Sequence, residues 1–333
     1  MAGSSRLTAL AALLCGACAA GSVLAQQSYT LVIGHVLDGE SSIHAGMKRF
    51  KESAEKQSGG RIKVNLFPGA TLGDSREMQL QTQSGAIFGL VDASTKMVNF
   101  VPEFGLLDIP FLVTTEEAAY RLLDGPDFDK IFNAKAERAG FRWLYSVDVS
   151  FRHIYTTKKP TRTIADLKGQ KIRVIPSPSF INLFRAFGSS PTPMNFGELY
   201  TALEQGVVDG AENDIITYYT SKHYEPAKKL AITNHMMLVQ GLNVSEKLWK
   251  SYPEDVRKVI WNAAIESRKG VMQERDRLMQ TTLDELKKKG VEVTRPPLKP
   301  FEDAARSTYG AFEERYGKAQ VDNIRALAAR AAE

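Results

Sequence analysis

Two short stretches decide the fold of this chain: Leu167–Ile175, which reads LKGQKIRVI, and Val208–Asn213, which reads VDGAEN. The first predicts a turn and then a short β-strand, because Ile172 and Val174 alternate with charged residues. Arg173 stands between these two apolar residues, so its side chain points away from the apolar face of the strand. The second stretch predicts another short strand.

The two strands end in polar side chains that suit a carboxylate ligand. Arg173 near one strand end and Asn213 near the other can hold a carboxylate, because the guanidinium takes both oxygens and the amide fixes the orientation. Glu212 precedes Asn213 and is expected to orient an arginine. The alternative is that Arg173 is an ordinary surface or salt-bridged arginine, and its spacing alone does not decide between the two.

The chain before these stretches alternates strands and helices. Strands are predicted at Tyr29–His35, Arg61–Phe67 and Ala86–Ala93, and residues 43–57 and 74–84 have the apolar spacing of helices. This order predicts a parallel sheet with helices on its faces. Ligands of such sheets bind at the carboxyl ends of the strands. Four polar candidates lie there: His35, Ser75, Glu77 and Ser94.

Residues 150–213 repeat the same order, and their first strand, Ser150–Thr156, carries a second candidate anion ligand, Arg152. Val101–Val113 predicts a buried loop, Thr217–Leu230 predicts a helix, and Met236–Val244 predicts a strand that returns to the first sheet. Asp255–Lys289 predicts a helix of roughly 50 Å, which is longer than one small domain. The sequence therefore predicts an α/β fold of two lobes, each with a mostly parallel sheet, joined by crossing strands and a long helix, with a cleft between them.

The first 25 residues predict an export signal that is cleaved. Arg6 is followed by the apolar run Leu7–Ala20 and then by small residues that end at Ala25. A lipid anchor on Cys15 or Cys18 is the alternative, although neither cysteine follows a good lipobox. Cleavage leaves a mature chain without cysteine, which excludes disulfides and cysteine chemistry and suits a bacterial periplasm.

Composition and missing motifs narrow the classes of function. The chain has 333 residues and a formal net charge of +5, too small a surplus to indicate nucleic-acid binding. It contains no nucleophile elbow, Walker A loop or dinucleotide-binding glycine motif, and no two histidines stand four residues apart, so neither a cofactor nor a metal is expected. Asp209 and Glu212 leave a lyase or hydrolase as an alternative. The plainer interpretation gives Asp209 a turn and Glu212 an arginine to orient.

The mature chain resembles the solute-binding subunits of tripartite ATP-independent periplasmic (TRAP) transporters, of the DctP family named for C4-dicarboxylate binding. The resemblance covers nearly all of the mature chain and rests on several motifs taken together. These are GHVLDGESSIH, FVPEFGLLDIPFL, SFRHIYTTKKP, ADLKGQKIRVIPSP, SSPTPMNFGELYTALEQGVVDGAEND and the downstream TNH, Thr233–His235.

This resemblance implies a role for individual residues. The family's carboxylate-clamping arginine falls on Arg173, in KIRV, and its frequent second arginine falls on Arg152, in FRHIYT. Its amide ligand falls on Asn213, in VDGAEN, and a ring that lines the cleft falls on Phe196. Two positions that often line the first-lobe side of the cleft correspond to Glu77 and Ser94.

The resemblance also implies a fold and a function. We expect a two-lobed periplasmic binding protein-like fold, with residues 26–149 and about 239–275 in lobe 1, and residues 150–238 and about 276–333 in lobe 2. We expect a monomeric, non-enzymatic protein that captures a sugar acid such as a uronate, or a C4-dicarboxylate, and delivers it to the small and large membrane subunits of a TRAP transporter. Sialic acid is disfavoured, because Ala93 and Asp214 depart from the pattern of sialic-acid binders. A binding protein that serves a signalling receptor is the alternative.

Overall fold

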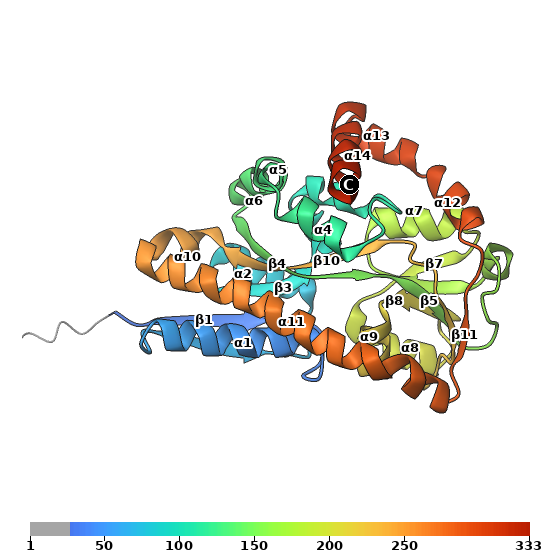
Figure 1. Cartoon of the computed structure of the whole chain (residues 1–333), viewed down its shortest axis with the longest axis horizontal. Coiled ribbons are helices and arrows are strands. Elements are labelled where there is room, and N and C mark those ends of the chain that lie inside the picture. Colours follow the sequence, from blue (N-terminus) through green and yellow to red (C-terminus); the bar gives the residue numbers. More distant parts are fainter. Residues whose placement is uncertain (1–26) are drawn as a thin grey trace, which may run out of the picture.

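The computed structural model describes residues 27–333 and contains two β-sheets that lie next to each other, each flanked by helices (Figure 1). The predicted export signal, residues 1–25, lies outside the described residues. We call the five-stranded sheet with its helices the first lobe, and the six-stranded sheet with its helices the second lobe. The two sheets confirm the predicted α/β architecture.

The first lobe is built on a sheet with the strand order β2-β1-β3-β10-β4. Strands β1, β2 and β3 run parallel, whereas β10 runs antiparallel to both β3 and β4. The predicted βαβαβ unit is therefore present, and the returning strand β10 makes the sheet mixed. The strands are β1 (Tyr29–Gly34), β2 (Ile62–Phe67), β3 (Gly89–Ala93), β4 (Phe141–Phe151) and β10 (Met237–Ser245).

The second lobe repeats this plan with the strand order β11-β9-β5-β8-β6-β7. Strand β6 is parallel to both β7 and β8, and β5 runs antiparallel to β8 and β9. This sheet is mixed as well, because one antiparallel strand borders the parallel unit. The strands are β5 (His153–Thr156), β6 (Lys171–Val174), β7 (Ser190–Pro193), β8 (Gly210–Asn213), β9 (Lys229–Ala231) and β11 (Glu292–Thr294).

The helices between the strands begin and end where local chemistry dictates. Helix α2 (Ser75–Ser84) starts with a capping box, in which Asp74 accepts from the Glu77 backbone and Glu77 accepts from the Asp74 backbone. It ends at Gly85, whose φ of 84° is the left-handed conformation that glycine adopts at no steric cost. The other helices of the parallel units are α1 (Ser42–Gln57), α3 (Ser94–Met97), α7 (Pro178–Ala186) and α8 (Leu199–Glu204).

Two strand-to-strand connections, β4 to β5 and β9 to β10, join the two sheets, and Arg152 lies in the first of them. Strand β4 ends at Phe151 and β5 begins at His153, so Arg152 is the single residue between the two sheets. Its backbone N–H donates to the carbonyl of Met236, the residue before β10, and its carbonyl accepts from the N–H of His235. The crossing strands predicted from the sequence are thus confirmed, and they pair with each other at the junction.

The long helix α11 (Glu254–Lys288) spans both lobes, as predicted (Figure 1). Val256, Ile260 and Val271 on its first half belong to the hydrophobic core under the first sheet. Leu286 near its end belongs to a core cluster of the second lobe. One continuous helix of about 50 Å therefore bridges the two lobes.

The C-terminal helices return towards the first lobe. Phe301 on α12 (Lys299–Arg306) packs in the core under the second sheet. Helix α13 (Tyr309–Tyr316) then packs against α14 (Lys318–Ala332), and α14 packs with α4 (Glu116–Leu123) of the first lobe. The exact residues assigned to each lobe remain our proposal. In that division the last helices belong to lobe 2, yet they contact the first lobe.

Three segments differ from their predicted secondary structure. Residues 217–230 were predicted to form one helix, but α9 (Ile215–Thr220) is short, because the chain turns at Lys222, whose φ is 57°, and then forms β9. The strand predicted in Val208–Asn213 begins only at Gly210. Pro102–Asp108, within the predicted buried loop, forms a buried 3₁₀ helix.

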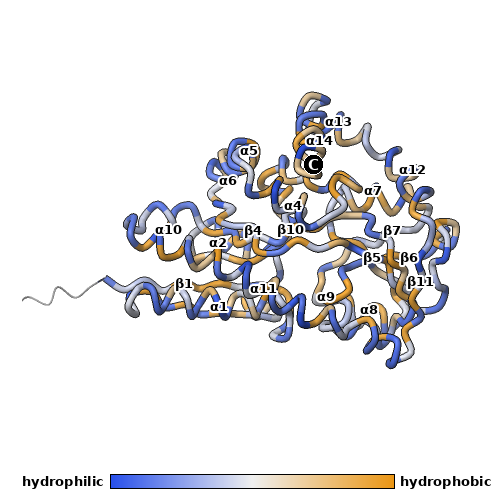
Figure 2. Tube along the Cα trace, in the orientation of Figure 1, coloured by the Kyte–Doolittle hydropathy of each residue, from blue (hydrophilic) through white to orange (hydrophobic). Residues whose placement is uncertain are grey.

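Apolar residues gather on the strands in the interior, and the surface helices alternate between hydrophilic and hydrophobic positions (Figure 2). This alternation buries one face of each helix against a sheet and leaves the other in water. Within residues 27–333, no helix combines the length and the apolar character that crossing a membrane requires.

Candidate functional site

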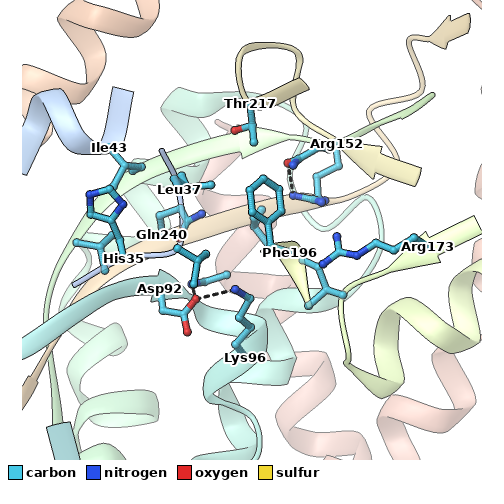
Figure 3. A pocket seen from close by; sticks show the side chains of 16 residues that line it. His35, Leu37, Ile43, Asp92, Lys96, Arg152, Arg173, Phe196, Thr217 and Gln240 are labelled. Atoms are coloured by element: carbon cyan, nitrogen blue, oxygen red, sulfur yellow. Dashed lines mark hydrogen bonds and ion pairs between the residues drawn. The ribbon is translucent and has the colours of Figure 1, made fainter. Parts of the chain in front are cut away.

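A cavity lies between the lobes, at the carboxyl ends of strands from both sheets. It has a volume of about 490 Å³ including its mouth, and residues that follow or end β1, β3, β6, β7 and β8 line it. This is where ligands of parallel α/β sheets bind, as the sequence predicted. Figure 3 shows Arg152, Arg173 and Phe196 on one side of the cavity, with His35 and Asp92 on the other.

Arg173 carries a buried positive charge that no carboxylate neutralises directly. Its side chain is 1% exposed, and its Nε and Nη2 both donate to the carbonyl oxygen of Met194, at 2.9 and 2.7 Å. Within the described chain, no carboxylate oxygen lies within 4.0 Å of its guanidinium nitrogens. Burial lowers the pKa of Arg173 to about 10, an effect that the more distant Glu212 charge opposes.

The bond to Met194 uses one edge of the guanidinium and leaves the Nη1–Nη2 edge for a ligand. A carboxylate matches such an edge with two parallel hydrogen bonds. Phe196, two residues after Met194, places its ring centroid 6.0 Å from the Arg173 guanidinium carbon and lines the same cavity. The segment that holds Arg173 therefore also supplies an aromatic wall.

Arg152 lies in the same cavity, but Glu212 neutralises its charge. The Arg152 Nε and Nη2 atoms contact the two carboxylate oxygens of Glu212, and both side chains are at most 2% exposed. Arg152 Nη1 donates to the Asn213 amide oxygen at 2.8 Å. Burial alone would lower the pKa of Arg152 and raise that of Glu212, but their mutual attraction reverses both shifts.

The predicted residues of the second lobe thus meet in one place. Arg152, Arg173, Phe196 and Asn213 all line the cavity. Glu212 lies behind Arg152, since it binds the guanidinium and does not line the cavity itself. The carboxylate expected to orient an arginine therefore orients Arg152.

The first-lobe predictions have different outcomes. His35 lines the cavity and is 1% exposed, and burial together with His44 lowers its pKa to about 4, so its ring is neutral at pH 7. Glu77 does not line the cavity, because its carboxylate closes the capping box of α2. Ser94 is buried at the start of α3 and does not line the cavity either.

An Asp92–Lys96 ion pair on the first-lobe side was missed at the sequence level. Lys96 Nζ lies 3.0 Å from Asp92 Oδ1 and donates to Ser75 Oγ at 2.7 Å, while Gln79 donates to Asp92 Oδ2 at 3.0 Å. Asp92 and Lys96 line the cavity, as does Gln240 of β10 (Figure 3). The available signal was an acid inside a buried strand, GLVDA, four residues before a lysine.

The charges around the cavity sum to one unit of positive charge. Arg152 is balanced by Glu212 and Lys96 by Asp92, which leaves Arg173 as the unbalanced group among the described lining residues and their direct partners. A second hollow of about 790 Å³, open to solvent, adjoins the cavity and shares Arg173, Phe196 and Lys96 with it. A small anion thus finds both a charge and a route to bulk water.

The carboxylate pair considered for an enzyme does not meet in the cavity. Asp209 accepts a hydrogen bond from the Lys171 backbone N–H at 2.8 Å and does not line the cavity, while Glu212 is occupied by Arg152. Among residues 27–333, no group of three histidine, cysteine, aspartate or glutamate side chains is arranged to hold a metal ion. The arrangement is suited to binding an anion.

Comparison with known proteins identifies relatives of this architecture. Residues 33–315 match the family model described as bacterial extracellular solute-binding protein, family 7 (DctP). The 2,3-diketo-L-gulonate-binding periplasmic protein YiaO of Escherichia coli is 31% identical over 288 residues, which cover 85% of this chain and 86% of YiaO.

Solved structures agree with this match. The sugar acid binding protein DctPAm of Advenella mimigardefordensis, in complex with galactonate, superposes with a TM-score of 0.88 at 27% identity, covering 92% of this chain and 99% of that one. A TRAP periplasmic solute-binding protein of Anaerococcus prevotii, with bound α/β-D-glucuronate, gives a TM-score of 0.85 at 29% identity, covering 90% and 98%.

Proposed function

The chain belongs to family 7 of the bacterial extracellular solute-binding proteins, and from this premise we propose that it binds a sugar acid with a single carboxylate and delivers it to a TRAP transporter. The chain is a TRAP-type solute-binding protein, and relatives of this family bind sugar acids, uronates and dicarboxylates. The proposal concerns which of these this chain takes, and how.

The observation that carries the proposal is the unbalanced charge of Arg173. A buried guanidinium without a counterion is costly, and an anion that enters the cavity removes this cost. One carboxylate neutralises Arg173, whereas the second carboxylate of a dicarboxylate would find Arg152 and Lys96 already paired. The charge balance therefore favours a monoanion over a C4-dicarboxylate.

The remaining polar groups around the cavity, whose charges sum to zero, favour a hydroxylated ligand. Asn213, Asp92, Lys96 and Gln240 line it and offer both donors and acceptors. Hydroxyl groups both donate and accept, so a polyhydroxylated chain or ring can satisfy such a mixture. Phe196 offers a flat apolar surface on which the C–H face of a sugar can rest. An aldonate or uronate fits these features better than a simple fatty acid.

Burial between the lobes gives the binding step its strength. In the open protein the ligand carboxylate first meets Arg173, and closure excludes water and strengthens the ion pair. Since a ligand contacts both lobes only in the closed form, it shifts the equilibrium between open and closed forms towards closure. The closed form then docks on the small and large membrane subunits, and no covalent bond of the ligand changes. We place the mature protein in the periplasm, after cleavage of residues 1–25.

A thermal-shift screen of residues 26–333 tests this function. The panel contains D-glucuronate, D-galactonate, succinate and malate, with glucose and galactitol as matched neutral compounds. We expect a sugar acid to raise the melting temperature and its neutral analogue to leave it unchanged, because binding to the native state alone stabilises it. A shift with succinate or malate but with no sugar acid contradicts the monoanion, and a shift with neutral compounds alone contradicts the carboxylate.

A further inference from the structure

Two aspartates of the first lobe each contact the second lobe directly. Asp38 lies in the loop after β1, where its Oδ1 accepts from the Glu40 backbone N–H at 2.8 Å. Its other oxygen, Oδ2, accepts from the hydroxyl of Ser221, just after α9 of the second lobe, at 3.3 Å. One carboxylate thus shapes its own loop and contacts the opposite lobe.

Asp74, in the loop after β2, repeats this arrangement. Its Oδ1 accepts from the Glu77 backbone N–H at 3.0 Å and caps α2. Its Oδ2 accepts from the side-chain amide of Asn195 in the second lobe at 3.0 Å. In both aspartates the local bond fixes the carboxylate in advance, so little conformational entropy is lost when the second bond forms across the cleft.

Both second-lobe partners belong to segments that also carry residues of the cavity. Asn195 stands between Met194, whose carbonyl oxygen holds the Arg173 guanidinium, and Phe196, which lines the cavity. Ser221 follows α9, which carries the cavity-lining Thr217. A change in the position of either segment therefore also moves side chains that line the cavity.

We propose that Asp38–Ser221 and Asp74–Asn195 are two latches that hold the lobes closed over the ligand and set how long the closed form lasts. This inference rests on the proposed function in one respect, namely that closure retains a ligand. The latches are positioning residues, because none of the four is required to touch the ligand. Each latch is one partly exposed hydrogen bond, so its loss is expected to change the closed population by only a few-fold.

The test uses one latch as the reporter and changes the other. The mature chain has no cysteine, since Cys15 and Cys18 precede residue 26. Asp74→Cys with Asn195→Cys therefore gives two thiols that a fluorogenic bifunctional reagent bridges only in the closed form. Into this reporter we introduce Ser221→Ala. The control is Ser251→Ala, which removes an exposed hydroxyl that bonds to Leu248 within the first lobe.

We expect Ser221→Ala to slow bridging about threefold and Ser251→Ala to leave the rate unchanged, because the closed fraction limits bridging when the reagent reacts slowly. A rate for Ser221→Ala equal to that of its control overturns the latch. The reverse arrangement places cysteines at Asp38 and Ser221 and compares Asn195→Ala with Asn262→Ala, whose amide bonds to Gln57 within the first lobe. This second reporter replaces the first one if Asp74→Cys, which removes the cap of α2, prevents the protein from folding.

Repeating the bridging measurement with D-glucuronate and the other acids of the panel distinguishes failure of this inference from failure of the proposed function. Bridging that slows with Ser221→Ala but does not respond to any acid of the panel supports the latch and contradicts the sugar-acid ligand. Bridging that accelerates with a sugar acid but is indifferent to Ser221→Ala and Asn195→Ala supports the ligand and overturns the latches. The reagent reports closure in the absence of any ligand. The comparison of Ser221→Ala with Ser251→Ala therefore does not depend on which acid the protein binds.

Discussion

Arg173 donates two hydrogen bonds to the carbonyl oxygen of Met194, from Nε at 2.9 Å and from Nη2 at 2.7 Å. This contact fixes the plane of the guanidinium and ties β6 to the segment after β7. It also means that Arg173 is held in place by a neutral acceptor. Its positive charge therefore remains for a ligand, whereas the charge of Arg152 is already balanced by Glu212.

Replacement of Arg173 by alanine is expected to weaken sugar-acid binding by more than about 100-fold, because a charge-assisted two-pronged contact is worth several kcal/mol in a site that excludes water. Isothermal titration calorimetry measures the loss. Arg185→Ala, which removes an exposed arginine from α7, is the control and should bind like the unmodified protein. Affinity retained within threefold by a folded Arg173→Ala protein would show that the anchor lies elsewhere.

Glu212→Gln is expected to destabilise the protein by about 3–5 kcal/mol, because it leaves the buried Arg152 guanidinium without its counterion. Urea unfolding followed by circular dichroism gives the free energy of unfolding. The matched change Glu292→Gln removes a carboxylate from solvent-exposed contacts with Arg162 and Lys229, and it should cost much less stability than Glu212→Gln. Equal losses for the two variants would mean that Arg152 does not need Glu212.

Asp108 gives the stability a pH dependence of its own. It is fully buried and accepts from the Thr95 hydroxyl at 2.7 Å, and burial raises its pKa from 3.8 to about 7, which hydrogen bonds from Thr95, Ser179 and Ser177 oppose. The native state then holds a proton that the unfolded chain releases, so this carboxyl lowers the stability progressively as pH rises from about 4 to about 7.

Asp108→Asn removes this dependence. The free energy of unfolding of the variant minus that of the unmodified protein is expected to increase with pH across this window and to level off above it. Urea unfolding at a series of pH values measures the difference, with the exposed Asp276→Asn on α11 as the control for an ordinary carboxylate. A difference that is flat from pH 4 to 7 would refute the raised pKa.

Gly46 allows α1 and α11 to pack closely. A Cβ atom at this position would lie 2.7 Å from the carbonyl oxygen of Ser267 and closer still to a methyl group of Val271, both on α11. Gly46→Ala should therefore cost about 1–3 kcal/mol of stability, although alanine favours a helix more than glycine does. Gly310→Ala on α13 has nothing within 4 Å of the new atom and is expected to be neutral or stabilising in the same thermal unfolding measurement. The opposite ranking would refute the close packing.

Local patterns were enough to predict much of the fold. The helix predicted at 255–289 is observed at 254–288, and the helix predicted at 74–84 is observed at 75–84 with Asp74 as its N-cap. These features depend on residues within a few positions of each other, so periodicity and capping chemistry determine them. The placement of Arg173 and Asn213 near strand ends follows in the same way, from the alternation in KIRV and from the position of Asn213 at the end of the strand predicted in VDGAEN.

The failures at the level of secondary structure occurred where tertiary contacts override local pattern. Residues 229–231 have a helical composition, yet they form β9, because β5 and β11 offer them backbone partners on both sides. Glu77 and Ser94 were predicted to line the cavity and do not. The carboxylate of Glu77 closes the capping box of α2 instead, and Ser94 is buried at the start of α3.

The sequence by itself determined two lobes, a crossing between them and an arginine, an amide and an aromatic ring at the right strand ends. Only the tertiary structure decided which charges neutralise each other. Glu212 pairs with Arg152 across 60 residues, and Asp92 and Lys96 close an ion pair on the other wall of the cavity. Charge pairing depends on distances between segments far apart in the chain, which no local periodicity encodes. That pairing left Arg173 unbalanced, and it is the basis for expecting a single carboxylate.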